Sequence, residues 1–336
     1  MKKRNGDIAV VKFIFMVLII IMHYNIPFAG KKYALEGAYI YVDFFFIIIG
    51  YYMVNTIGNQ KETIKSTCDY VWSKFKRFFP WVLVQSVFLM PIELLFFCEG
   101  YKDVIKLLSG IVMDCSFTSL IYPINYHYNG SLWFLSAAIL VGGVVHFFFK
   151  QYEKTFLFLA PIVGIGIYNY MIIKNGDLDI WHSFVCSSFF QDALFRALAG
   201  MLLGVFCRFM VEQYKENGAF LSDKLIVVIE VVSIICSICF AFLVPHTSYD
   251  FIQIVLFLII IWTCNIRENP FSGSFFRYLD KITLPMYVFQ VVCIRVVLVL
   301  FDNITWLNML VILSFDFIIS NMLIKVEDMW IKSRNR

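Results

Sequence analysis

Residues 8–26 of this chain read IAVVKFIFMVLIIIMHYNI, a membrane-length apolar run interrupted by Lys12 and, near its end, by His23. A helix that crosses a bilayer needs about 20 mostly apolar residues. The rest of the chain has the same character, since 60% of its 336 residues are hydrophobic and only 15% are charged. Soluble domains contain about 45–50% apolar and about 25% charged residues. The composition therefore excludes a water-soluble protein and predicts an integral membrane protein with several crossings.

Ten segments are long and apolar enough to cross a membrane, and they lie at residues 8–26, 39–57, 79–99, 131–149, 155–173, 192–211, 225–244, 249–266, 282–301 and 305–324. None alternates apolar and polar residues as β-barrel strands do, so helices must satisfy the backbone polar groups inside the lipid. We therefore expect an all-α polytopic membrane protein with about ten transmembrane helices. Residues 1–336 are expected to form a single membrane domain without an appended soluble domain.

The positions of Lys and Arg predict the orientation. With a cytoplasmic N-terminus, 20 of the 28 Lys and Arg residues fall in inner connections, five in outer connections and three within spans. Positive residues concentrate on the cytoplasmic side of membrane proteins. Both termini are therefore expected in the cytoplasm, in agreement with an even number of spans. The longest outer connection, residues 100–130, begins with YKDVIKLLSGIVMDCSF, which can form an amphipathic or re-entrant helix.

The same charge distribution makes a nucleic-acid partner unnecessary, because it explains the net charge of +4 as a topology signal. Cys236 and Cys239 form a C-x-x-C inside an apolar segment, with no second cysteine pair and no histidine cluster. Packing explains them better than metal or redox chemistry. No metal site is expected, and the sequence does not determine the oligomeric state.

Lys12 and His23 are polar residues inside the first predicted span, where such residues are costly and usually face a partner or a cavity. They are eleven residues apart, which is about three helical turns, so both side chains lie on nearly the same face, about 16 Å apart along the axis. Two simpler interpretations stay open. Lys12 can extend to the inner headgroups, and His23 can be an interfacial residue bonded to a backbone carbonyl.

Five pieces of the chain occur in the order found in a known family. They are DIAVVKFIFMVLIIIMHYN with Lys12 and His23, YVDFFFIIIGYYM with Asp43, FKRFFPWVL with Arg77, GSLWFLSAAIL with Trp133, and DKITLPMYVFQ near the C-terminus. Together they resemble the bacterial membrane acyltransferase family called acyltransferase 3, whose members O-acylate cell-surface sugars. The chain departs from the family where it has Lys12 in place of a frequent Arg, which loses the bidentate guanidinium, and where it has Gln290 in place of a late His.

The resemblance implies transfer of an acyl group, usually acetyl from acetyl-CoA, to a hydroxyl of a cell-envelope glycan or lipid-linked sugar. No permanently bound cofactor is expected, because acyl-CoA is a donor substrate. A hydroxyl attacks a thioester slowly unless a base removes its proton, and histidine titrates near neutral pH. We therefore expect a catalytic centre of His23, Lys12 and Asp43. His23 would be the general base or, alternatively, a transient acyl carrier, and Asp43 would orient His23 or a basic neighbour.

Charged and aromatic residues on either side of this centre suggest how the two substrates bind. Arg77 and Arg277, together with Lys12, are candidates to hold the CoA phosphates, since clustered cations favour a polyanion. Trp133, Tyr126 and His127 are candidates for an outer wall that takes the sugar. The alternatives are a positive-inside topology charge for Arg77 and an interfacial aromatic belt for the outer residues. For Asp43 the alternative is a structural hydrogen bond between helices.

A transporter or flippase for a small solute or glycan is the rival function. Arg196, Arg295, Glu230 and Asp316 lie within predicted spans and would suit a translocation path. The sequence shows no inverted repeat and no pair of broken helices, which many transporters have. A sensory or accessory membrane domain is a third interpretation, which the pairing of Lys12 with His23 disfavours. For an acyltransferase we expect a multi-pass protein of the bacterial cytoplasmic membrane, in contact with the lipid bilayer.

Overall fold

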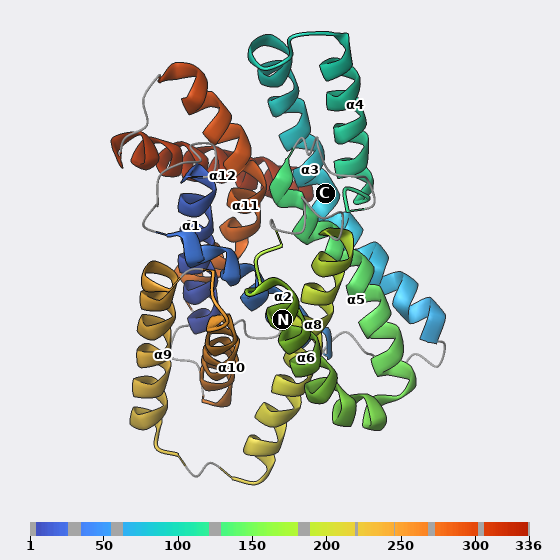
Figure 1. Ribbon diagram of the computed structural model, residues 1–336, viewed down its shortest axis with the longest axis vertical. Helices are drawn as coiled ribbons and strands as arrows, with labels where there is room; N and C mark the ends of the chain where they lie inside the picture. The colour runs from blue at the N-terminus through green and yellow to red at the C-terminus, as the bar shows by residue number, and fades with distance from the viewer. Residues whose placement is uncertain are drawn as a thin grey trace.

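The computed structural model describes residues 5–25, 35–54, 63–120, 129–180, 189–218, 221–244, 246–267, 273–301 and 306–334 (Figure 1). The helices in these ranges are α1 Gly6–Asn25, η2 Glu36–Ile40, α2 Tyr41–Met53, α3 Thr63–Phe96, α4 Tyr101–Ser116, η4 Gly130–Leu132, α5 Trp133–Gln151, α6 Glu153–Asn175, α8 Phe189–Glu216, α9 Asp223–Leu243, α10 Asp250–Ile266, α11 Ser274–Leu300 and α12 Trp306–Arg334. No strand occurs in the described ranges. The all-α prediction is confirmed.

Each of the ten predicted spans coincides with a helix. Among the described residues, eight helices are long and apolar enough to cross a membrane: α1, α3, α5, α6, α8, α9, α11 and α12. The remaining two, α2 with 13 residues and α10 with 17 residues, are shorter than a typical spanning helix. The exact number of crossings therefore stays a prediction.

Helices α3 and α11 begin earlier than the apolar pattern predicts. The sequence places the start of the third span at residue 79 and of the ninth at residue 282, whereas α3 begins at Thr63 and α11 at Ser274. Both extensions are polar, so hydropathy alone misses them, but good helix formers such as Lys, Arg and Leu continue the helix. As a result, the positive charges of these two segments sit on regular helix.

Helix α4 lies in the longest predicted outer connection, where an amphipathic or re-entrant helix is expected. Leu107, Gly110 and Asp114 are its buried residues, at the i, i+3 and i+7 spacing of one helical face. Its opposite side exposes Ile105, Leu108 and Val112. Helix α4 pairs with the outer part of α3, and the two stand together at the upper right of Figure 1.

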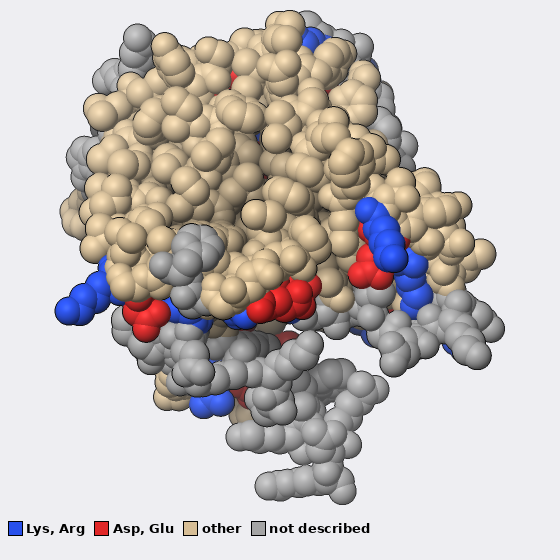
Figure 2. Space-filling model, turned by 90° about the horizontal axis from the view of Figure 1, so that it is seen from below, with Lys and Arg blue, Asp and Glu red and all other residues tan. Residues whose placement is uncertain are grey.

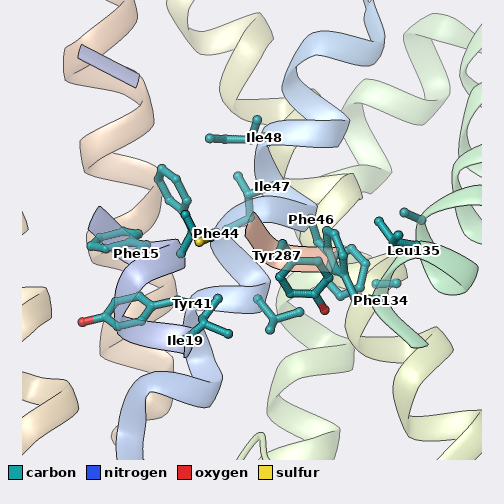
Figure 3. Close-up of a cluster of buried hydrophobic side chains, with 14 of the residues drawn as sticks. Phe15, Ile19, Tyr41, Phe44, Phe46, Ile47, Ile48, Phe134, Leu135 and Tyr287 are labelled. Carbon is teal, nitrogen blue, oxygen red and sulfur yellow. The ribbon is translucent and has the colours of Figure 1, made fainter. Parts of the chain in front are cut away.

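Helix α2 forms the centre of the core. Its aromatic side chains interdigitate with Phe15 of α1 on one side and with Phe134 of α5 and Tyr287 of α11 on the other (Figure 3). The rings of Phe15 and Tyr41 stack with centroids 4.2 Å apart, and those of Phe46 and Phe134 lie 4.7 Å apart. Aromatic pairs at such distances contribute about 0.5–1.5 kcal/mol each beyond area burial.

Glycines let α2 and α8 approach closely. A Cβ added to Gly50 would lie 2.1 Å from the carbonyl oxygen of Met201, and one added to Gly204 would lie 2.0 Å from that of Ile47. Gly200 and Gly204 form a G-x-x-x-G on α8, the spacing with which small residues bring membrane helices together. A larger residue at either contact would force the two backbones apart.

The outer surface of the bundle is apolar. Helix α9, for example, exposes Leu225, Val228, Val231, Val232 and Ile235. Figure 2 shows one broad face with few charged side chains across its centre and with Lys, Arg, Asp and Glu gathered toward one edge. Such a surface is the complement of a lipid bilayer and not of water.

Contacts between helix ends fall into two groups. One group joins Tyr39 to Asp250 and His246 to Asp177, all in or beside segments predicted on the outer side. The other joins Asn5 to the carbonyl of Cys264, Arg208 to Tyr51 and Thr63 to Gln151, all near segments predicted on the inner side. The two groups agree with the alternation of a ten-span chain.

Candidate functional site

Lys12 and His23 both contact one partner helix. The ammonium of Lys12 donates to Asp280 Oδ1 of α11. Nδ1 of His23 lies 2.8 Å from Oε1 of Gln290, on the same helix. Positions increase together along both helices, so α1 and α11 run parallel. The common face predicted from the eleven-residue spacing is therefore the face that packs against α11.

The hydrogen bonds of Gln290 determine which nitrogen of His23 carries the proton. Nε2 of Gln290 donates to the carbonyl oxygen of Tyr287 at 2.8 Å, and a carbonyl can only accept. This bond directs Oε1 of Gln290, an acceptor, toward His23. In the neutral imidazole, Nδ1 therefore carries the hydrogen and Nε2 keeps its lone pair. Nε2 has no hydrogen-bond partner in the part of the chain that the structure describes.

The turn of α11 that holds Gln290 is fixed from its other side by residues around η4. The hydroxyl of Tyr287 donates to the carbonyl oxygen of Ser131, and Nδ2 of Asn129 donates to that of Val288 at 3.3 Å. Asn129 is fully buried, and its Oδ1 accepts from the backbone N–H of Ser131 at 3.0 Å, which caps η4. This framework restrains Gln290 against movement relative to His23.

Asp43 is expected to orient either His23 or a basic neighbour, and the structure pairs it with a basic residue, Arg196. Its Oδ2 accepts from Nε and Nη2 of Arg196 at 2.7 and 2.5 Å, and its Oδ1 accepts from the hydroxyl of Tyr168 at 2.8 Å. Both carboxylate oxygens are thus engaged, and none of these partners is His23. The catalytic role of Asp43 stays a prediction, and the contacts shown are those of a bridge between α2, α6 and α8.

Trp133 lies beside this ion pair. The guanidinium carbon of Arg196 is 5.9 Å from the centroid of the Trp133 ring and 5.8 Å from that of Tyr39, and its Nη2 donates to the Tyr39 carbonyl at 2.7 Å. Trp133 is buried, with 4% of its surface exposed. It therefore sits in the interior and not in an interfacial belt. Tyr126 and His127, the other two predicted sugar-binding residues, lie outside the described residues.

Cations gather at the inner ends of α1, α3 and α11. The charges of Lys12 and Arg77 both act on Lys74, which also stands over the ring of Tyr70 with its Nζ 5.2 Å from the centroid. Arg77 and Arg277 are exposed. Arg277 lies one turn before Asp280, the partner of Lys12. The structure thus brings the predicted phosphate-binding cations to one end of the bundle and adds Lys74 to them.

A second polar cluster occupies the opposite end, in and beside the predicted outer connections. His246 contacts the carboxylates of Asp177 and Asp179 at 3.4 and 3.6 Å, and its ring stacks on Tyr39 with centroids 4.9 Å apart. The hydrogen bond to Asp177 raises the pKa of His246 above its usual value, against the opposing effect of burial. The hydroxyl of Tyr39 in turn donates to Asp250 at 2.5 Å.

The sequence analysis named the candidate residues but did not identify the residues that pair with them. Arg196 is singled out in the sequence only as part of a translocation path, Asp280 is not singled out, and Gln290 is noted only as a departure. The periodicity of α11 contained a signal, because Asp280 and Gln290 are ten residues apart, only one fewer than Lys12 and His23. It is visible only once the two helices are known to pack together.

The chain matches the family model of the acyltransferase domain over residues 5–324. No curated protein and no solved structure matches it significantly. The matched range covers every helix that contributes to the contacts described above.

Proposed function

Since the chain belongs to the acyltransferase 3 family and is a membrane acyltransferase, we propose that it transfers an acyl group, usually acetyl, from acyl-CoA to a hydroxyl of a cell-envelope or exported glycan. The observation that carries the proposal is the hydrogen bond of 2.8 Å between His23 Nδ1 and Gln290 Oε1. In the neutral imidazole this bond places the hydrogen on Nδ1, so Nε2 can accept a proton. This is the protonation state that a general base needs.

The reaction follows from that state. Nε2 of His23 removes the proton of an acceptor hydroxyl as its oxygen attacks the thioester carbonyl of the donor. The carbon–sulfur bond then breaks, and His23 returns the proton to the departing thiolate of CoA. Gln290 acts as a positioning residue, because it holds the ring and its tautomer without touching the substrates, much as the third member of a catalytic triad does.

The cations at the inner end are suited to the donor. Lys12 is neutralised by Asp280, so its contact holds α1 in register with α11. Lys74, Arg77 and Arg277 remain for the phosphates of CoA, because no ion pair of theirs is found among the described residues. Acyl-CoA is made in the cytoplasm, which is the predicted side of these residues. His23 lies deeper, so a donor held here would extend its thioester into the bundle.

The residues that suit the rival transport function are engaged with other residues. Arg196 pairs with Asp43, Arg295 with Glu93 at 2.8 Å, and Glu230 with Arg267 at 3.3 Å. Asp316 accepts from Ser320 in its own helix at 3.3 Å. These contacts involve different helices and do not join into one path. No observation therefore favours transport over acyl transfer.

Labelled acetyl-CoA tests the proposal. Membranes that contain the wild-type protein should transfer label to an envelope glycan, and His23→Gln should lower the rate by about 10²–10⁴-fold, the usual contribution of a general base. His246→Gln is the matched control, since it removes a histidine that contacts Asp177 and Asp179 instead of Gln290. Equal transfer by His23→Gln and wild type would refute the assignment of His23. If the wild type labels no envelope fraction, the proposed acceptor class is wrong.

A further inference from the structure

Two buried polar side chains beside the candidate site have unmet hydrogen-bonding capacity. Gln85 of α3 has 0% of its surface exposed, and neither its Oε1 nor its Nε2 has a partner among the described residues. Asp114 of α4 is 2% exposed, and its Oδ2 likewise has no partner there. Leaving such groups unpaired costs about 1–3 kcal/mol each, and folded proteins contain few of them.

Gln85 and Asp114 lie at one level where α3 meets α4. Ser86 Oγ and Cys115 Sγ are 3.9 Å apart, and the two polar residues directly precede this pair. Gln85 belongs to the buried face of α3, and Asp114 to the buried face of α4. Both side chains therefore face the protein interior and not the lipid.

The same two residues connect to the turn of α11 that holds His23. The backbone N–H of Asn129 donates to Asp114, and the Asn129 side chain donates to the carbonyl of Val288. On α3, the ring of Phe88, one turn beyond Gln85, lies 6.2 Å from that of Phe289. Val288 and Phe289 immediately precede Gln290, the partner of His23. Gln85 and Asp114 thus approach the candidate base from the side of α3 and α4.

The unmet groups define the ligand chemistry. Burial raises the pKa of the Asp114 carboxyl well above its usual value. The neutral carboxyl can therefore donate a hydrogen bond as well as accept one, as can the amide of Gln85. Neither group then carries a charge, so a bare cation or an anion would find no opposite charge at this buried place, and burying an unpaired charge is costly. Two neighbouring hydroxyls of a neutral sugar satisfy both, because each hydroxyl donates one bond and accepts others.

We propose that Gln85 and Asp114 form a binding site for two neighbouring hydroxyl groups of the sugar acceptor. We call this pair the hydroxyl site. The inference rests on the proposed function, which supplies the acceptor class, and it adds the residues that recognise it. The hydroxyl site lies next to the predicted outer connection, so the sugar would reach His23 from the side opposite the cations that suit CoA.

A binding measurement tests the hydroxyl site without activity. The purified full-length protein is unfolded by heat in detergent, with and without methyl β-D-glucopyranoside or methyl β-D-N-acetylglucosaminide. At least one sugar should raise the Tm of the wild type, because a ligand that binds only the folded state stabilises it. Gln85→Met and Asp114→Leu should lose this rise. Gln253→Met and Asp316→Leu should keep it, as they change buried residues of the same types on α10 and α12.

The Tm without sugar separates binding from a packing role. Gln85→Met removes an unpaired buried amide, so the variant should be at least as stable as the wild type. If neither sugar stabilises the wild type, or if Gln85→Met and Asp114→Leu keep the full rise, the hydroxyl site is refuted.

Transfer from labelled acetyl-CoA gives the second arm. In membranes, Gln85→Met and Asp114→Leu should each lower label in glycan about tenfold or more, since a site that hydrogen-bonds a hydroxyl depends strongly on that bond. The concentration of acetyl-CoA that half-saturates transfer should not change. Full transfer by both variants would overturn the inference while the proposed function stands. No transfer by the wild type would overturn the proposed function, and the sugar-dependent Tm would still decide the hydroxyl site.

Discussion

Two polar contacts in the bundle interior differ in whether they leave a hydrogen-bonding atom without a partner among the described residues. Between α2 and α8, Asp43 and Arg196 are buried, and both oxygens of Asp43 are engaged by Arg196 and Tyr168. Between α1 and α11, His23 is only partly buried and has one nitrogen engaged by Gln290. The first contact engages both carboxylate oxygens and links three helices, which is a structural arrangement. The second keeps a lone pair for chemistry, which is why His23 is the better candidate base.

Removing one partner of the buried ion pair should give the largest loss of stability. Arg196→Met leaves Asp43 uncompensated in the interior, so we expect a loss of about 3–5 kcal/mol in the free energy of unfolding. His23→Gln should leave the Tm nearly unchanged although it lowers the transfer rate by about 10²–10⁴-fold. Thermal unfolding of both variants in detergent compares them. An Arg196→Met variant as stable as the wild type would contradict a structural role for the ion pair. If the double variant Asp43→Leu/Arg196→Met regains stability, the loss in Arg196→Met comes from the unpaired carboxylate of Asp43.

Replacing Gln290 should lower activity without an equal loss of stability. Gln290→Leu releases the constraint on the tautomer of His23, and we expect kcat to fall about 10–100-fold, as for other groups that orient a functional histidine. Gln290→Glu should restore part of the rate and move the pH profile upward, because a carboxylate favours the protonated imidazole. The measurement is transfer of labelled acetyl against pH. Identical profiles for Gln290→Glu and wild type would contradict the positioning role.

The close approach of α2 to α8 predicts a smaller effect on stability. A Cβ at position 204 would lie 2.0 Å from the carbonyl oxygen of Ile47, so Gly204→Ala must separate the helices and should cost about 1–3 kcal/mol. Gly166→Ala in α6 is the control, because nothing lies within 4 Å of the added carbon. Its effect should be neutral or favourable, since Ala is the better helix former. Equal Tm values for the two variants would refute the tight contact.

Replacing His246 should have the smallest effect on stability, and this effect should depend on pH. The contact with Asp177 raises the pKa of His246 in the folded protein above that of the unfolded chain. Its stabilising contribution is therefore complete below the unfolded pKa, about 6.5, and is lost as the pH rises through the folded pKa. The Tm difference between wild type and His246→Gln should be largest near about pH 6 and shrink in alkaline buffer. A difference that grows with pH would contradict this sign.

Hydropathy predicted the positions of the helices well because lipid leaves the backbone few alternatives. It failed at the polar extensions of α3 and α11, where no apolar run marks the helix start. It also could not identify α2 as a short central helix with ten of its residues buried, since an apolar run looks the same against lipid and against protein.

The amino-acid sequence determined the fold class, the family and the common face of Lys12 and His23. These depend on composition, order and the helical period, all of which are local properties of the chain. The tertiary structure decided what each polar residue does, because the partners lie far apart in sequence: Asp43 and Arg196 by 153 residues, His23 and Gln290 by 267. Whether a buried polar group is satisfied or free depends on which helices pack together and on how their side chains are oriented.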